Sequence, residues 1–171
     1  ISSTKPVAIL LFTANTGNYA TDFMPVLPDL LHGNDYILPS PGDDPTLNGG
    51  SRPLNIYAYN PDPANALVVS TIDTNGPATL ALAANQTRDY STRTCAGACP
   101  TTYVPSNSSV RLTANRNFWG VAVHDHQGQA NDWGYAWLAT SFLKSSYTVP
   151  YAPGVRNPVA AIRMHAQLLA Q

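Results

Sequence analysis

The chain has 171 residues, enough for one domain with a hydrophobic core, and 44% of them are hydrophobic, which excludes a disordered polypeptide. Only 11% of the residues are charged and the formal net charge is -1, so the chain lacks the basic surface that binds nucleic acids or anionic membranes. No apolar run is long enough to span a membrane as a helix. The 15 prolines, spread along the whole chain, disfavour long helices and favour short strands joined by turns.

The first half of the chain predicts short strands separated by turns. The apolar run Val7–Phe12 predicts a buried strand, and the two prolines of Phe23–Leu31 exclude a regular helix and predict an extended or irregular packed segment. Tyr36–Leu38 predicts a short strand stopped by the prolines that follow it. The strands predicted after Leu38 have the length and spacing of a hairpin or meander. These predicted strands are Leu54–Tyr59, Ala66–Ile72 and Ala78–Ala83.

A long polar segment, Gly42–Pro53, is predicted to be a loop. Its adjacent carboxylates, Asp43 and Asp44, are suited to help hold a calcium ion, which takes about six to eight oxygen ligands. The spacing of an EF-hand is absent, so the alternative is an ordinary turn rich in Asp and Gly.

The polar region that follows carries signs of the secretory pathway. Cys95 and Cys99 form a C-x3-C pair without further ligands nearby, which is a poor zinc site and predicts a local disulfide. Asn85, in NQT, and Asn107, in NSS, match the sequon for N-linked glycosylation. Together with the sparse charge, these features predict a secreted, extracellular or cell-surface glycoprotein. Since the chain begins without an initiator Met or signal peptide, we expect a mature or excised form.

Beyond this region, Val110–Ala114 predicts another strand, and Asn115–Asn117 is predicted to turn the chain into an aromatic stretch that extends to Tyr151. This stretch contains all three tryptophans of the chain. It is predicted to begin as a strand, to continue through the polar loop HDHQGQANDWG, and to end in a second strand-like run, Ser146–Tyr151.

The polar loop combines aromatic rings with amide and carboxylate groups, as sugar-binding sites do. A ring stacks on the apolar face of a pyranose while polar groups bond its hydroxyls. We therefore predict a binding loop on a rigid scaffold. Its candidate ligand-binding residues are Gln127, Gln129, Asn131, Asp132, Trp133 and Tyr135. The alternative is that Trp133 and Tyr135 are anchors in the core or at its rim.

The same loop contains the motif His124-Asp125-His126. Residues two apart on a strand share a side, so His124 and His126 could offer two imidazoles to one metal, such as zinc, with Asp125 or Asp132 adding a carboxylate. Such a site would activate a water molecule. Because the strand is predicted to end near His124, ordinary loop histidines are the alternative. With neither a G-x-S-x-G motif nor a phosphate-binding loop in the sequence, a non-catalytic protein without a cofactor is the leading prediction.

The C-terminal segment has helical rather than strand-like spacing. We predict a helix over residues 155–171, with Pro158 near its start, docked on the domain or leading into the rest of a longer protein. Its apolar side is formed by Val159, Ile162, Ala166 and Leu169. The predicted organisation is thus a β-sandwich domain at residues 1–154 and a helical extension at 155–171.

Three segments resemble the IgGFc-binding-protein N-terminal domain family. They are ISSTKPVAILLF, DFMPVLPDLLHGNDYILPSP and NFWGVAVHDHQGQANDWGYAWLATSFLKSSYTVPYAPG. The likeness lies in patterns of apolar and turn residues over about residues 1 to 154. It implies a β-rich extracellular module for adhesion or binding and carries over no catalytic residues. The final helix departs from the family pattern, which would continue with further strands.

Together these features predict one all-β domain, a jelly-roll or Ig-like two-sheet sandwich of short, mainly antiparallel strands with one C-terminal helix. The predicted function is a secreted binding or adhesion module for a glycan or glycoprotein. One alternative is a structural subunit of an extracellular filament or matrix array, which would self-associate or repeat along a longer chain. The other is a metal-dependent hydrolase that uses His124 and His126.

Overall fold

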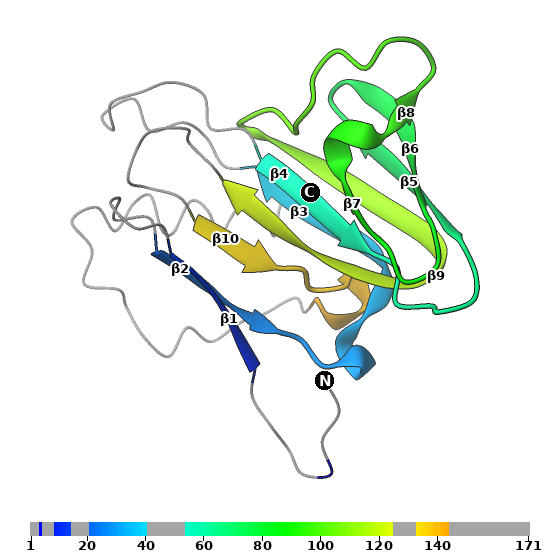
Figure 1. Cartoon of the computed structure of the whole chain (residues 1–171). Coiled ribbons are helices and arrows are strands. Elements are labelled where there is room, and N and C mark those ends of the chain that lie inside the picture. The colour runs from blue at the N-terminus through cyan, green and yellow to red at the C-terminus, as the bar shows by residue number, and fades with distance from the viewer. Residues whose placement is uncertain (1–3, 5–8, 15–20, 41–53, 125–132, 144–171) are drawn as a thin grey trace, which may run out of the picture.

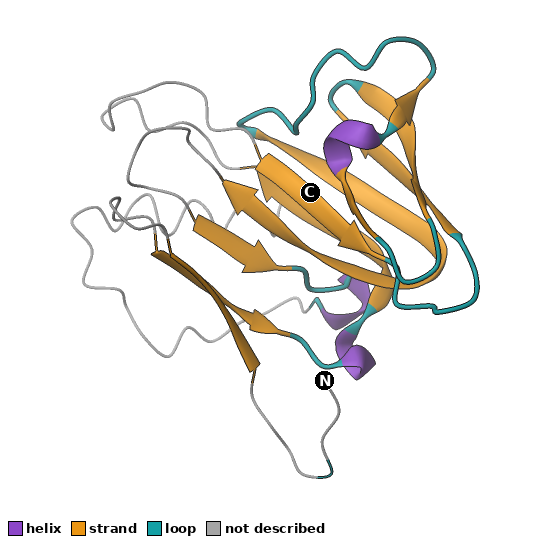
Figure 2. Ribbon diagram, viewed as in Figure 1, coloured by secondary structure: helices purple, strands orange, loops and turns teal. Residues whose placement is uncertain are grey.

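The structure is a computed structural model, and the residues that it describes are 4, 9–14, 21–40, 54–124 and 133–143 (Figure 1). Strands dominate these residues, and every strand pairing among them is antiparallel (Figure 2). Helix in the described ranges is confined to the short 3-10 turns η1 (Asp29–Leu31), η2 (Tyr90–Thr92) and η3 (Thr140–Phe142). The predicted all-β class is therefore confirmed.

Ten strands lie in the described parts of the chain. They are β1 (Ile9–Ala14), β2 (Thr21–Val26), β3 (Gly33–Ser40), β4 (Leu54–Tyr59), β5 (Leu67–Asp73), β6 (Gly76–Leu82), β7 (Thr87–Asp89), β8 (Thr94–Cys95), β9 (Ser108–His124) and β10 (Trp133–Ala136).

The long strand β9 holds the main sheet together. Its first half pairs with β3 on one edge and β5 on the other, and its second half pairs with β4 and β10. The sheet continues from β5 through β6 to β8, and from β4 to β7. Figure 1 shows β9 bending between its halves, so that the sheet curls. The two-stranded ribbon β1–β2 is separate, and its strand β2 lies beside β10.

The predicted turn at Asn115–Asn117 is wrong, because these residues lie inside β9. At this point β9 passes the connection between β4 and β5, where neither strand pairs with it. Arg116 spans that gap, with its guanidinium donating to the carboxylate of Asp62 and to the carbonyl of Ala66. The polar residues therefore form a bend in a continuous strand rather than a turn.

Prolines lie within strands β2 and β3. The segment Phe23–Leu31, predicted to be extended or irregular, is extended as far as Val26 in strand β2, in which Pro25 is in register with Leu10 of β1. The predicted strand Tyr36–Leu38 is longer than expected, because β3 continues through Pro39 to Ser40. Both prolines are tolerated because, among the described strands, β2 pairs with β1 alone and β3 with β9 alone, which leaves some backbone N–H groups outside the ladders.

Three other strands predicted in the first half of the chain agree closely with the structure. Leu54–Tyr59 is confirmed residue for residue, and β5 and β6 lie within one or two residues of their predicted bounds. The two-sheet sandwich stays a prediction, as does the domain boundary at residue 154. The predicted run Ser146–Tyr151 and the predicted helix at 155–171 lie outside the described residues.

Alternate residues of β3, β4, β5, β6 and β9 face one hydrophobic core. In β4, for example, Leu54, Ile56 and Ala58 are buried whereas the residues between them face outward. The even-numbered positions of β9 continue this inner face on both sides of its bend. Fully buried members in β9 are Val110, Leu112, Phe118 and Ala122. The bend thus keeps one face of the strand inside throughout.

Three aromatic rings form the centre of this core. Tyr36, Phe118 and Trp137 are fully buried and meet edge to face, with centroids 5.0 Å apart for Tyr36 and Phe118 and 5.4 Å apart for Tyr36 and Trp137. The Tyr36 hydroxyl accepts from the Gly33 N–H at 2.7 Å and donates to the Phe118 carbonyl at 2.6 Å. Such ring pairs contribute about 0.5–1.5 kcal/mol each beyond their burial, so the cluster joins β3, β9 and the segment after β10.

Gly120 is required by this packing. A Cβ at this position would lie 2.2 Å from the Tyr57 carbonyl oxygen and 2.6 Å from Cη2 of Trp137. Both neighbours are fixed, the first by the pairing of β4 with β9 and the second by burial. The absence of a side chain at Gly120 therefore allows Trp137 to lie flush against the sheet.

We expect the substitution Gly120→Ala to destabilise the chain by about 1–3 kcal/mol or more, because the new methyl group overpacks the core. The matched control is Gly97→Ala, since a Cβ at Gly97 meets no atom within 4 Å beyond its chain neighbours. Urea unfolding of both variants gives the comparison. Equal stability of the two variants would contradict the tight approach of Trp137 to β9.

Candidate functional site

The stem of the predicted binding loop is fixed at one end of the sheet. His124 of β9 is in register with Trp133 of β10 on one edge and with Leu54 of β4 on the other. The loop between His124 and Trp133 therefore leaves the sheet from a row of three paired strands. Four predicted ligand-binding residues lie outside the described residues, namely Gln127, Gln129, Asn131 and Asp132. His126 and the predicted calcium segment Gly42–Pro53 lie outside them as well.

Tyr135 is the predicted ligand-binding residue whose side chain the structure describes. Its ring packs against the hydrophobic core, and its hydroxyl donates to the Pro39 carbonyl at 2.7 Å. Burial raises the pKa of the Tyr135 hydroxyl far above its usual value. These contacts anchor β10 to β3, as the alternative reading of this residue expects. A contact between Tyr135 and a ligand stays a prediction.

Metal ligands do not gather in the described part of the chain. No group of three or more His, Cys, Asp or Glu side chains there is placed to hold a metal ion. His124 is the last residue of β9, and its predicted partner His126 is not among the described residues. The metal site of the hydrolase alternative therefore stays a prediction.

The predicted disulfide is confirmed. Cys95 and Cys99 are bonded, with their Cα atoms 5.3 Å apart, so neither is a thiol nucleophile. The loop that contains them is also held by Arg93, which lies 4.1 Å above the Tyr90 ring and donates to the Thr101 carbonyl at 3.0 Å. A covalent bond and a buried cation thus order a segment that has little core of its own.

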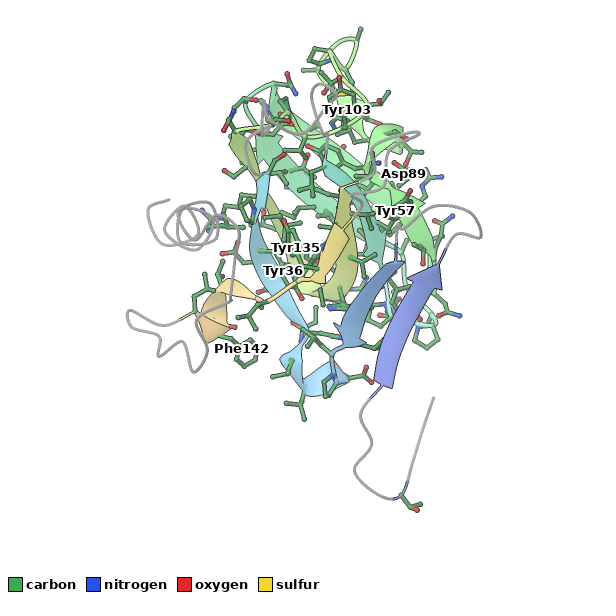
Figure 3. All side chains as sticks on the ribbon, turned by 90° about the vertical axis from the view of Figure 1, so that its left-hand side faces the viewer. Tyr36, Tyr57, Asp89, Tyr103, Tyr135 and Phe142 are labelled. Carbon is green, nitrogen blue, oxygen red and sulfur yellow. A yellow bond between two sulfur atoms is a disulfide. The ribbon has the colours of Figure 1, made fainter. Side chains whose placement is uncertain are left out.

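An outward-facing group of side chains on β4 and β7 was not among the predicted site residues. We call Tyr57, Tyr59, Thr87 and Asp89 the tyrosine patch. Tyr57 is in register with Asp89, and Tyr59 with Thr87, so all four share one face of the sheet. Figure 3 shows Tyr57 and Asp89 beside each other, away from the interior positions of Tyr36 and Tyr135.

The tyrosine patch presents an aromatic ring next to polar groups. Tyr57 is 37% exposed. One carboxylate oxygen of Asp89 accepts from the Ser91 N–H at 2.7 Å, and the other has no hydrogen bond to the described residues. Thr87 is exposed on β7, which pairs with β4 alone among the described strands. The patch therefore offers a ring, a carboxylate oxygen and a hydroxyl to a ligand.

Part of this patch was visible in the sequence. The alternation in LNIYAY already places Tyr57 and Tyr59 on the side of the strand opposite its apolar residues. The missing signal was the pairing with β7, a strand of only 3 residues in a polar region. No local pattern identifies so short a strand, and without it Asp89 cannot be placed beside Tyr57.

A buried histidine lies next to this patch. Trp119 is in register with Tyr59, and the ring of His32 stacks on Trp119 with centroids 5.6 Å apart and planes within 13°. The His32 side chain is 8% exposed, and burial lowers its pKa despite the opposing effect of Asp29. The His32 Nε2 and Trp119 Nε1 atoms are buried and have no hydrogen-bond partner among the described residues.

Helices of the described ranges are all too short to cross a membrane. Comparisons of the chain with protein-family models, with curated proteins and with solved structures found no match.

We expect the stability of the chain to decrease as the pH falls below about 6.5, the ordinary pKa of histidine. Because the pKa of His32 is lowered on folding, the unfolded chain takes up a proton at a higher pH than the folded chain, which favours unfolding in acid. The loss is complete once the pH lies below the folded-state pKa. Urea unfolding between pH 7.5 and pH 5, at roughly half-unit steps, measures it.

The control for this pH dependence is His32→Phe, which keeps a ring against Trp119 but does not titrate. Since the other histidines are the same in both proteins, the difference between the two pH profiles isolates His32. Identical profiles would show that the histidine is not desolvated in the folded chain.

Proposed function

We propose that the chain is an extracellular, non-catalytic module that binds a glycan or glycoprotein, and that the tyrosine patch is a contact surface for the sugar. The observation that carries the proposal is the exposed Tyr57 ring opposite the Asp89 carboxylate. The C–H groups on one face of a pyranose stack on an aromatic ring, and the hydroxyls at its rim donate to a carboxylate. A tyrosine paired across two strands with an aspartate meets both requirements.

The charge of the chain suits a neutral ligand. With a net charge of -1, the protein has no field to attract a polyanion or polycation over a distance. Stacking and hydrogen bonding act at contact and need no such field. An uncharged sugar is therefore the class of ligand that this surface supports best.

The predicted binding loop belongs to this proposal as a second contact region. It leaves the sheet at His124, in register with Leu54, and Leu54 begins the same strand that carries Tyr57. We propose that Gln127, Gln129, Asn131, Asp132 and Trp133 add polar and aromatic contacts at that end of β4. Two contact regions on one strand suit an extended oligosaccharide better than a single sugar.

The location and the finer architecture are also part of the proposal. The Cys95–Cys99 disulfide supports an oxidising compartment, and hence secretion or display on the cell surface. The resemblance to the IgGFc-binding-protein N-terminal domain family supports an adhesion or binding module. We further propose that the curled sheet forms the predicted two-sheet sandwich and that residues 155–171 form its C-terminal helix.

Titration with neutral glycans, both mucin-type and cell-wall derived, tests the proposal by calorimetry. We expect Tyr57→Ala to weaken binding at least about tenfold, which corresponds to about 1.4 kcal/mol. The control is Ile72→Ala, which removes another exposed apolar side chain, 54% exposed, on β5 outside the tyrosine patch. This control should bind as the unaltered chain does.

Two results would contradict the proposal at different points. If no glycan binds to the unaltered chain, the function itself is wrong. If a glycan binds and Tyr57→Ala leaves its affinity unchanged while Trp133→Ala abolishes it, the loop is the site and the tyrosine patch is not.

A further inference from the structure

Both sequon asparagines occupy the same kind of backbone position. Asn85 and Asn107 have φ angles of 52° and 56° and are the non-glycine residues with positive φ in the described part of the chain. Each is exposed and ends a turn that leads into a strand, Asn85 into β7 and Asn107 into β9. Asparagine tolerates this left-handed conformation better than most residues. Both turns therefore present an asparagine side chain to solvent.

The surroundings of Asn85 distinguish it from Asn107. The Tyr59 hydroxyl donates to Oδ1 of Asn85 at 2.5 Å, and the Asn85 main-chain N–H donates to the Asp62 carbonyl at 2.8 Å. The amide is thus oriented by its oxygen, and Nδ2 is left without a hydrogen bond to the described residues. No hydrogen bond to a described residue orients the Asn107 side chain in this way.

The third residue of each sequon differs as well. Thr87 is exposed on β7, and its neighbour across the strands is Tyr59. Ser109 is half-buried within the central strand β9, in register with Pro39 of β3. The Asn85 sequon therefore leads into β7, which pairs with β4 alone among the described strands, and both Asn85 and Thr87 are exposed there.

We propose that Asn85 carries an N-linked oligosaccharide whose first sugar lies against the ring of Tyr59. The donor is a lipid-linked diphosphate oligosaccharide, supplied with its transferase by the secretory pathway. A bond forms between Nδ2 of Asn85 and C1 of the first sugar, and the bond from C1 to the diphosphate oxygen breaks. Nδ2 loses one proton, and the lipid diphosphate leaves with the electron pair of the broken bond.

This modification site rests on the extracellular location in the proposed function, because it needs the secretory pathway, but it does not depend on the binding of a glycan. The attached sugar would cover the Tyr59 end of the tyrosine patch, since the Tyr59 hydroxyl is hydrogen-bonded to the Asn85 side chain. Tyr57 is two residues away from Tyr59 on β4, and Asp89 is two residues away from Thr87 on β7, so both would stay accessible. The glycan would then limit how far a ligand extends along β4 without blocking the exposed ring.

The test expresses the full chain behind a secretory signal peptide in eukaryotic cells. Glycopeptide mapping of the secreted, unaltered chain should find sugar on Asn85. The intact mass should decrease by one oligosaccharide in Asn85→Gln and in Thr87→Ala, and should keep that oligosaccharide in Thr87→Ser and in Asn107→Gln. A secreted chain with a formed Cys95–Cys99 bond and an unmodified Asn85 overturns the proposal, whether or not Asn107 is modified.

A second measurement tests the contact with Tyr59. The melting temperature of the glycosylated chain should exceed, by a measurable margin, that of the same unaltered sequence produced in bacterial cells without the glycan, so that the hydrogen bond between Tyr59 and Asn85 is present in both. In a Tyr59→Ala background the same comparison should show little or no gain, because the ring that the sugar packs against is gone. An equal gain in both backgrounds would retain the glycan but overturn its packing on Tyr59.

Discussion

The unbroken backbone of β9 is the constraint on which the rest of the structure depends. A strand has two edges, and both edges of both halves of β9 are occupied, by β3, β5, β4 and β10. One backbone therefore places four strands at once. Its bend is stabilised by the polar contacts of Arg116 and by the hydrogen bond that the Tyr36 hydroxyl donates to the Phe118 carbonyl. Because the inner face stays inside on both sides of the bend, a single core serves the whole curled sheet.

The core and the tyrosine patch are opposite faces of the same few residues. Gly120 is in contact with Trp137 on its inner side and with the backbone of Tyr57 in the neighbouring strand. The side chain of Tyr57 points outward because its neighbours Ile56 and Ala58 are committed to the core. The position of the exposed ring is thus set by hydrophobic packing behind it rather than by contacts on the surface. A site built on a strand in this way is held more rigidly than one carried by a loop.

Strands whose pattern is complete within a few residues could be predicted from the sequence, whereas elements that depend on distant partners could not. Leu54–Tyr59 could be predicted because its alternation is complete within one strand. The strand conformation of Asn115–Asn117 could not be predicted, because three successive polar residues are typical of a turn. The contact that holds them in a strand is between Arg116 and Asp62, more than fifty residues apart in the chain. The tyrosine patch is an intermediate case: both tyrosines were visible in the pattern, but their partners belong to an edge strand too short to be recognised. Predicted residues of the binding loop lie outside the described ranges, so for them only the stem can be compared.

Sparse charge gives the surface its particular chemistry. Beside ion pairs such as that of Arg116 with Asp62, a buried amide, that of Asn60, also fixes the connections, donating to the Asn65 and Ala83 carbonyls at 2.9 and 3.0 Å. The same hydroxyl and amide groups that keep an uncharged surface hydrated are those that bond the hydroxyls of a sugar. Polar groups alone therefore cannot mark a glycan site on this protein, because exposed polar residues occur in several of the described strands and turns. The distinguishing feature is an aromatic ring exposed beside them, and the pairing of Tyr57 with Asp89 supplies it where β4 meets β7.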